Sequence, residues 1–122
     1  MSAVLDASAI LAFVRGEAGA GVVEAELCDG SRCSAANWSE VAQKVLAADR
    51  DWGLVRALLV SYGLRVEPVE VDDAEWAARR WTRGEGLSLA DRLCLALAER
   101  VGEAVLTADL AWGSSGRVRQ IR

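Results

Sequence analysis

Histidine is absent from this 122-residue sequence, and lysine occurs only once, at Lys44. A carboxylate that is turned away from water therefore has only arginine, solvent or a metal ion available as a partner. The three cysteines are an odd number, and we expect them to be reduced thiols, with Cys94 acting as a small core residue. Cys28 and Cys33 are five residues apart and have no histidine or second cysteine pair to complete a zinc site. A structural zinc site is therefore disfavoured.

Long hydrophobic runs are also missing, and no segment is long enough to cross a membrane. Residues 1–12 lack the basic start and the cleavage site of a secretory signal, so we expect a cytoplasmic protein without membrane contact. The net charge of −4 argues against a broad basic surface for nucleic acid. It does not exclude a nucleic-acid enzyme whose acids are gathered in a metal site. The length predicts one domain, residues 1–122, with a core of its own.

Short apolar runs alternate with helical patterns along the whole chain. This alternation predicts an α/β domain with a short, mostly parallel sheet of four to five strands flanked by helices. We expect strands at 3–5, 32–34, 65–66, 104–107 and 118–121. Helices are expected near 7–15, 20–29, 37–48, 52–62, 72–81 and 88–101, with Asn37 capping the third and Asp72 or Asp73 opening the fifth.

The segment from Ser88 to Val101 is the most strongly patterned part of the chain. Its apolar residues recur at spacings of three, four and seven, which is typical of an amphipathic helix. Ser88 is a favourable N-cap, and Asp91 follows three residues later, as in a capping box. At about 100° per residue, Asp91 lies on the same side as Cys94 and Ala98, toward the core. An acid directed inward at the start of a helix needs a partner.

Four acids are expected at one edge of the sheet. Asp6, Glu40 and Asp109 follow predicted strands, and Asp91 begins the helix that leads into another. Ligands bind beyond the carboxyl ends of parallel strands, and this edge is therefore the expected site. Each acid could be a helix cap or a partner in a capping box, Asn37 serving Glu40 and Ser88 serving Asp91.

Together, however, four carboxylates repel one another, and a hard divalent cation relieves that repulsion. Without histidine, an all-oxygen site favours Mg²⁺ or Mn²⁺, and the chemistry that suits it is phosphoryl transfer. Ser8 and Thr107 lie two residues from Asp6 and Asp109, respectively. Their hydroxyls either orient carboxylates or a phosphate, or form local turns and caps.

Five tryptophans are many for a chain of this length. We expect Trp38 and Trp112 to pack in the core. Trp76 and Trp81 are five residues apart and cannot share one helix face, so at least one of them should be exposed or in an interface.

Four segments then carry a family resemblance: VLDASAILAFVRGE, SAANWSEVAQKV, LSLADRLCLALAER and AVLTADLAW. In this order the sequence resembles the PIN-domain ribonucleases, and among them the VapC-type toxins of bacterial toxin–antitoxin pairs. The resemblance implies a three-layer PIN-like domain and a Mg²⁺-dependent endoribonuclease in which Mn²⁺ can substitute. It also implies an RNA substrate, a small cognate antitoxin and a homodimer. The implied catalytic residues are Asp6, Glu40, Asp91 and Asp109, with Asp6, Asp91 and Asp109 as metal ligands and with Ser8 and Thr107 in support.

Three other functions compete with this interpretation. A metal-dependent phosphatase of similar opening sequence needs a second acid two residues after Asp6, where this chain has Ser8. A phospho-receiver domain needs a later lysine, whereas Lys44 lies in the middle of a predicted helix. A catalytically inactive PIN-like protein-binding module is the third possibility, and the presence of all four acids counts against it.

Overall fold

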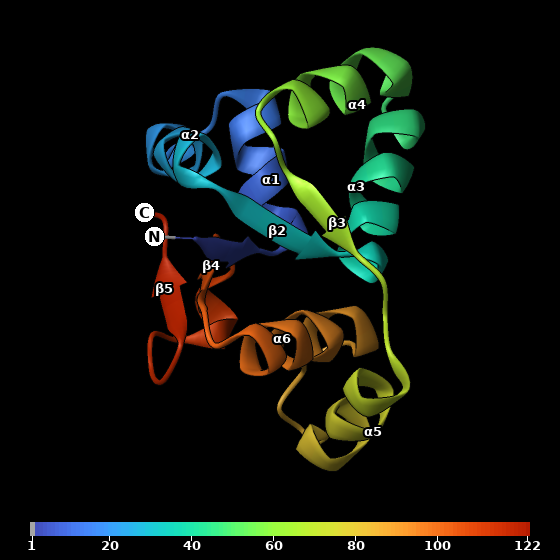
Figure 1. Ribbon diagram of the computed structural model, residues 1–122, viewed down its shortest axis with the longest axis vertical. Coiled ribbons are helices and arrows are strands. Elements are labelled where there is room, and N and C mark those ends of the chain that lie inside the picture. The colour runs from blue at the N-terminus through green and yellow to red at the C-terminus, as the bar shows by residue number, and fades with distance from the viewer. Residues whose placement is uncertain (1) are drawn as a thin grey trace.

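The computed structural model describes residues 2–122, and its centre is a parallel sheet of five strands in the order β3-β2-β1-β4-β5 (Figure 1). Every pair of neighbouring strands is parallel, with Leu5 opposite Leu106 in the central pair. Parallel strands require crossover connections, which the helices between them supply. The expected α/β fold with a short parallel sheet is confirmed. The strands are β1 (Ala3–Leu5), β2 (Ser31–Ser34), β3 (Arg65–Glu67), β4 (Ala104–Thr107) and β5 (Val118–Gln120).

Helices cover both faces of the sheet and give the domain three layers. The helices α1 to α4 lie on one side, and α5 and α6 lie on the other (Figure 1). Their bounds are α1 (Ala7–Arg15), α2 (Ala20–Asp29), α3 (Ala35–Ala47), α4 (Trp52–Ser61), α5 (Val71–Arg80) and α6 (Leu89–Val101), with a short 3₁₀ helix η1 (Leu110–Trp112) after β4. No helix among residues 2–122 is long and apolar enough to cross a membrane.

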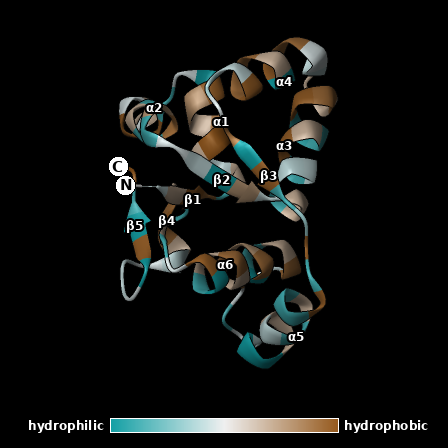
Figure 2. Ribbon diagram, viewed as in Figure 1, coloured by the Kyte–Doolittle hydropathy of each residue, from teal (hydrophilic) through white to brown (hydrophobic). Residues whose placement is uncertain are grey.

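The sheet has an apolar cluster on each face. Leu5 of β1 belongs to the larger cluster with α1 to α4, whereas its neighbour Val4 packs with Cys94 and Leu97 of α6. Successive side chains of a strand point to opposite faces, so one short strand contributes to both layers. Figure 2 shows hydrophobic residues gathered on the central strands and on α6, while α5 is more hydrophilic. Full burial of a leucine or valine contributes about 1.5–3 kcal/mol, and these central strands anchor the site residues that follow them.

Two helix starts differ from the prediction. Ser34, not Asn37, is the N-cap of α3, and its hydroxyl accepts a hydrogen bond from the N–H of Ala36. The helix follows β2 without a loop, so Asn37 lies in its first turn and is buried. Likewise Glu70 precedes α5, while Asp73 accepts the backbone N–H of Glu70. Local capping signals failed here because several acceptable caps stand close together in the sequence.

Trp38 and Trp112 pack beside the core and not within it. Trp38 packs edge to face against Trp52 beside the larger cluster, and Trp112 packs against the smaller one, although both are only half-buried. Trp76 is half-buried, whereas Trp81 is 51% exposed. The expectation that one of these last two is exposed is therefore confirmed. The three cysteines are free thiols, as expected, and Cys33 and Cys94 are buried.

Candidate active site

Asp6 is a buried carboxylate at the junction of β1 and α1. Its side chain is only 4% exposed, and one of its oxygens caps α1 by accepting the Ala9 N–H at 2.8 Å. The Ser8 hydroxyl donates to the same oxygen at 2.7 Å, and the Thr107 hydroxyl donates to the other oxygen at 2.6 Å. A helix cap requires only the first of these contacts. Asp6 is thus held from several directions, by its own helix and by the neighbouring strand.

The two hydroxyls orient this carboxylate and are not merely turn or cap groups. Each hydroxyl donates its single proton in a hydrogen bond to Asp6, and each accepts a hydrogen bond from a backbone N–H. Ser8 Oγ accepts from Ala108 at 2.9 Å, and Thr107 Oγ1 accepts from Asp109 at 3.0 Å. Because β1 and β4 are neighbours in the sheet, these bonds join the carboxyl ends of both strands. Both hydroxyls therefore contact the Asp6 carboxylate, while Thr107 Oγ1 also makes the local turn contact with the N–H of Asp109, and the supporting role of the two residues in the site stays a prediction.

The environment of Asp6 disfavours its ionised form. The pKa of Asp6 is raised from 3.8 to about 6, chiefly by burial and to a smaller extent by nearby Asp91, while the hydrogen bonds from Thr107, Ala9 and Ser8 act in the opposite direction. With this pKa, Asp6 changes its charge near neutral pH, and a bound cation would stabilise its ionised form.

Asp91 and Glu40 lie close enough to add to this negative field. Burial raises the pKa of Glu40; Lys44 then lowers it, and Asp91 raises it. Asp6, Asp91 and Glu40 also all raise the pKa of the buried Cys94 thiol, after the larger effect of its burial. Three of the four predicted acids therefore affect the pKa of the same buried thiol in α6, so they lie near one another.

Asp91 itself occupies the predicted capping box. One oxygen of its carboxylate accepts the Ser88 N–H at 2.9 Å, and its own N–H donates to the Ser88 hydroxyl at 3.1 Å. The side chain is half-buried and retains a second oxygen for which no hydrogen bond is found within residues 2–122. The capping role and a ligand role are thus compatible for this residue.

Asn37 is placed differently from the prediction, whereas Asp109 takes the capping position that the sequence left open for it. Asp109 is exposed and caps η1 by accepting the N–H of Ala111, and its role as a metal ligand stays a prediction. Asn37, predicted as a cap, donates instead from its side-chain nitrogen to the carbonyl of Ala90 at 3.4 Å. Its amide oxygen is buried without a hydrogen-bond partner within residues 2–122. No local sequence signal marked Asn37 for this position beside the start of α6.

The donor chemistry suits a divalent cation held by few protein ligands. Among residues 2–122, no three acidic, cysteine or histidine side chains are grouped so that they could hold one ion. Mg²⁺, however, is bound in proteins by one or two carboxylates and keeps several waters or takes phosphate oxygens. Asp6 and Asp91 are two mutually repelling carboxylates, and the unpartnered oxygen of Asn37 offers a water an acceptor nearby. The residues fit Mg²⁺ on these grounds, and the ligand roles remain predictions.

Comparison with known proteins assigns the fold to a family. The sequence signature of the PIN domain matches residues 3–113. The chain belongs to the PIN-domain family. It is 40% identical over 114 residues to a VapC ribonuclease of Mycobacterium bovis and to the ribonuclease VapC42 of Mycobacterium tuberculosis, covering 84% of this chain and 87% of each relative.

Two solved structures share this fold at low sequence identity. A toxin–antitoxin complex from Klebsiella pneumoniae aligns with a TM-score of 0.77 and 19% identity over 99% of this chain and 98% of that one. The sarcin–ricin loop cleaving toxin VapC20 of Mycobacterium tuberculosis aligns with a TM-score of 0.75 and 20% identity over 96% and 97%, respectively. The PIN fold that the sequence motifs predicted is thereby confirmed.

Proposed function

We propose that this PIN-domain protein is a Mg²⁺-dependent endoribonuclease, in which Mn²⁺ can replace Mg²⁺, and that it acts as the toxin of a VapBC-like toxin–antitoxin pair. The VapC ribonucleases with 40% identity over most of the chain support the activity. The observation that carries the proposal is the buried Asp6 carboxylate. It accepts hydrogen bonds from the Ser8 and Thr107 hydroxyls, and the negative charge of Asp91 repels it. A solely structural cap would not require two hydroxyls from different elements.

Asp6 and Asp91 are the proposed ligands of the ion, and Asp109 the third that the family resemblance implies. When bound, Mg²⁺ supplies a Lewis acid that activates water and neutralises charge on the phosphodiester. The Ser8 and Thr107 hydroxyls fix both oxygens of Asp6, so that its carboxylate does not rotate when charge changes nearby. Glu40 has a pKa raised by burial and by Asp91, and it is the proposed base that orients the attacking water.

The capping hydrogen bonds serve the same chemistry. Asp6 and Asp91 are both placed by the N-terminal N–H groups of helices, which carry partial positive charge. At Asp6, the Ala9 N–H favours the ionised carboxylate that binds a cation, against the burial that disfavours it. Asp109 caps η1 at the rim, where its exposed carboxylate remains accessible to solvent and to a bound RNA.

A small antitoxin partner, a homodimer and a cytoplasmic location complete the proposal. All three follow from the VapC resemblance, and apolar side chains left exposed on α3 and α4 support the two protein contacts. Leu54 is 69% exposed, Leu46 57% and Val60 50%. Monomeric proteins seldom leave so many large apolar side chains uncovered on adjacent helices, so a protein partner on this face is favoured.

The decisive test is cleavage of an RNA pool containing tRNA, rRNA and a defined mRNA by the purified protein, with Mg²⁺ or with EDTA. Asp91→Asn is the inactive variant, since asparagine keeps an acceptor for the Ser88 N–H and should leave α6 in place. Asp51→Asn is the matched control, because Asp51 is an exposed N-cap of α4. We expect discrete products that require both Mg²⁺ and Asp91.

Equal cleavage by the wild type and Asp91→Asn would reveal a contaminating nuclease and contradict the proposal. An absence of cleavage by well-folded protein freed of any inhibitor would favour the protein-binding module instead. Cleavage that persists in EDTA would contradict the metal requirement alone.

A further inference from the structure

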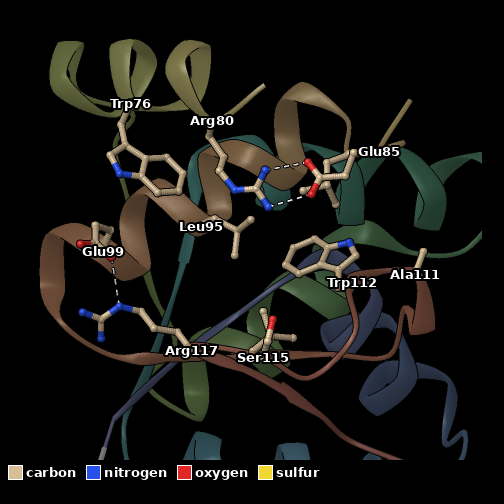
Figure 3. A pocket seen from close by; sticks show the side chains of 11 residues that line it. Trp76, Arg80, Glu85, Leu95, Glu99, Ala111, Trp112, Ser115 and Arg117 are labelled. Atoms are coloured by element: carbon tan, nitrogen blue, oxygen red, sulfur yellow. Dashed lines mark hydrogen bonds and ion pairs between the residues drawn. The ribbon is translucent and has the colours of Figure 1, made fainter. Parts of the chain in front are cut away.

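A cavity of about 210 Å³ lies on the α5–α6 side of the sheet and is formed by segments distant in the sequence. Trp76 and Arg80 come from α5, Leu95 from α6 and Trp112 from η1, while Arg117 lies just before β5 (Figure 3). The site described above uses none of these side chains. Sequence patterns gave no indication of this cavity because its walls meet only in the folded chain.

The volume suits one planar ring. Engineered protein cavities of about 150 Å³ admit benzene, whereas drug-sized ligands need about 300 Å³ or more. Two indoles line the cavity, those of Trp76 and Trp112, and Leu95 lies between them in the close view (Figure 3).

Charge in the cavity wall is balanced. Arg80 and Glu85 form a bidentate pair at 2.6 and 2.9 Å, and Arg117 pairs with Glu99 at 3.2 Å (Figure 3). Because each guanidinium is already neutralised, the cavity does not favour a free phosphate. It instead presents hydrogen-bond donors and acceptors around apolar ring faces, which is the environment that suits a neutral heteroaromatic ring.

Two chain segments that line the cavity also hold acids of the candidate active site. Trp112 belongs to η1, the short helix that Asp109 caps. Leu87 also lines the cavity and directly precedes Ser88, whose backbone N–H holds Asp91. A group bound in the cavity therefore lies beside the segments that fix two of the four acids.

We propose that this cavity binds one unstacked nucleobase of the RNA strand, next to the phosphodiester that the active site cuts. The inference rests on the proposed ribonuclease function and adds its sequence preference. Proteins read single-stranded RNA by stacking splayed bases on aromatic rings and by hydrogen bonds to the base edges. Trp76 and Trp112 supply the ring faces, while the two ion pairs supply edge contacts.

The test measures base binding without catalysis. The protein in EDTA is titrated with AMP, GMP, CMP and UMP, and with ribose 5-phosphate as a probe that lacks the base. Binding is followed by NMR through the indole N–H signals, which are assigned by Trp76→Phe and Trp112→Phe. We expect at least one nucleotide to shift the Trp112 and Trp76 signals and ribose 5-phosphate to leave them in place.

A pair of matched variants tests whether nucleotides bind in this cavity. Ser115 lines the cavity and its neighbour Ser114 does not, so Ser115→Leu and Ser114→Leu differ only in position. We expect Ser115→Leu to weaken nucleotide binding about 5- to 150-fold, the range given by one base–aromatic contact, and Ser114→Leu to leave it unchanged. Trp76→Ala should weaken binding similarly and provides a second test should Ser115→Leu fold poorly.

Three results would overturn the proposal: no shift with any nucleotide, equal shifts with ribose 5-phosphate, or unchanged affinity in both cavity variants. Indole signals that move only when a small protein partner binds would make this a protein-docking site and would equally overturn it. Base binding is measured apart from RNA cleavage. Cleavage without base binding therefore contradicts this inference alone, and base binding without cleavage contradicts the ribonuclease proposal.

Discussion

Replacing Asp6 by asparagine should stabilise the metal-free protein at neutral pH. Asparagine keeps an oxygen for the Ala9 N–H and for one hydroxyl, but it removes a charge from a side chain that is only 4% exposed. The pKa of Asp6 is raised from 3.8 to about 6, chiefly by burial. Since a raised acid pKa favours the neutral form in the folded state, stability from this group is complete below about pH 4 and is lost as the pH rises through about 6.

The expected size follows from linkage. A rise in pKa from 3.8 to about 6 corresponds to about 3 kcal/mol at pH 7.5, because each tenfold change in proton affinity is worth about 1.4 kcal/mol. At pH 5 the same relation gives about half of that value. Asp6→Asn should therefore exceed the wild type in free energy of unfolding by up to about 3 kcal/mol at pH 7.5, and by clearly less at pH 5.

Urea unfolding in EDTA at pH 5 and pH 7.5 measures both differences, and Asp51→Asn at an exposed cap gives the baseline for the same substitution. Adding Mg²⁺ should stabilise the wild type and not Asp6→Asn, since a ligand that binds only the folded state raises its stability. An Asp6→Asn variant that is less stable than the wild type at pH 7.5 would refute this reasoning, as would a difference independent of pH. Either result would mean that the carboxylate is a stabilising helix cap.

Two further predictions concern hydrogen bonds to buried acids. Thr107→Val removes the 2.6 Å bond to Asp6 and should reduce stability by about 1–3 kcal/mol. It should also lower kcat for RNA cleavage and raise the Mg²⁺ concentration needed, whereas Thr107→Ser should restore both, as activity titrations will show. Arg100→Met breaks the ion pair with Asp73, which is 5% exposed, and should destabilise the protein by about 3 kcal/mol in urea unfolding. A change below about 1 kcal/mol, typical of a surface pair, would contradict the structural role given to Arg100.

Local patterns in the sequence determined the elements, their order and part of the site. Alternating short apolar runs and helical periodicities defined the α/β class, and the box formed by Ser88 and Asp91 is present as predicted. Asp6 at the end of β1 was also placed correctly, since chain connectivity and the parallel sheet require it. These features depend on residues within a few positions of one another, where spacing alone carries the information.

Only the tertiary structure decided how distant residues meet. The bond from Thr107 to Asp6 spans 101 positions, and the buried contact of Asn37 with Ala90 spans 53. The cap of α3 is Ser34 and not Asn37, because β2 leads directly into the helix. The cavity between α5, α6 and η1 likewise exists only once helices cover the sheet. Sequence spacing fixes which side of an element a residue occupies, whereas packing of the layers decides what that side faces.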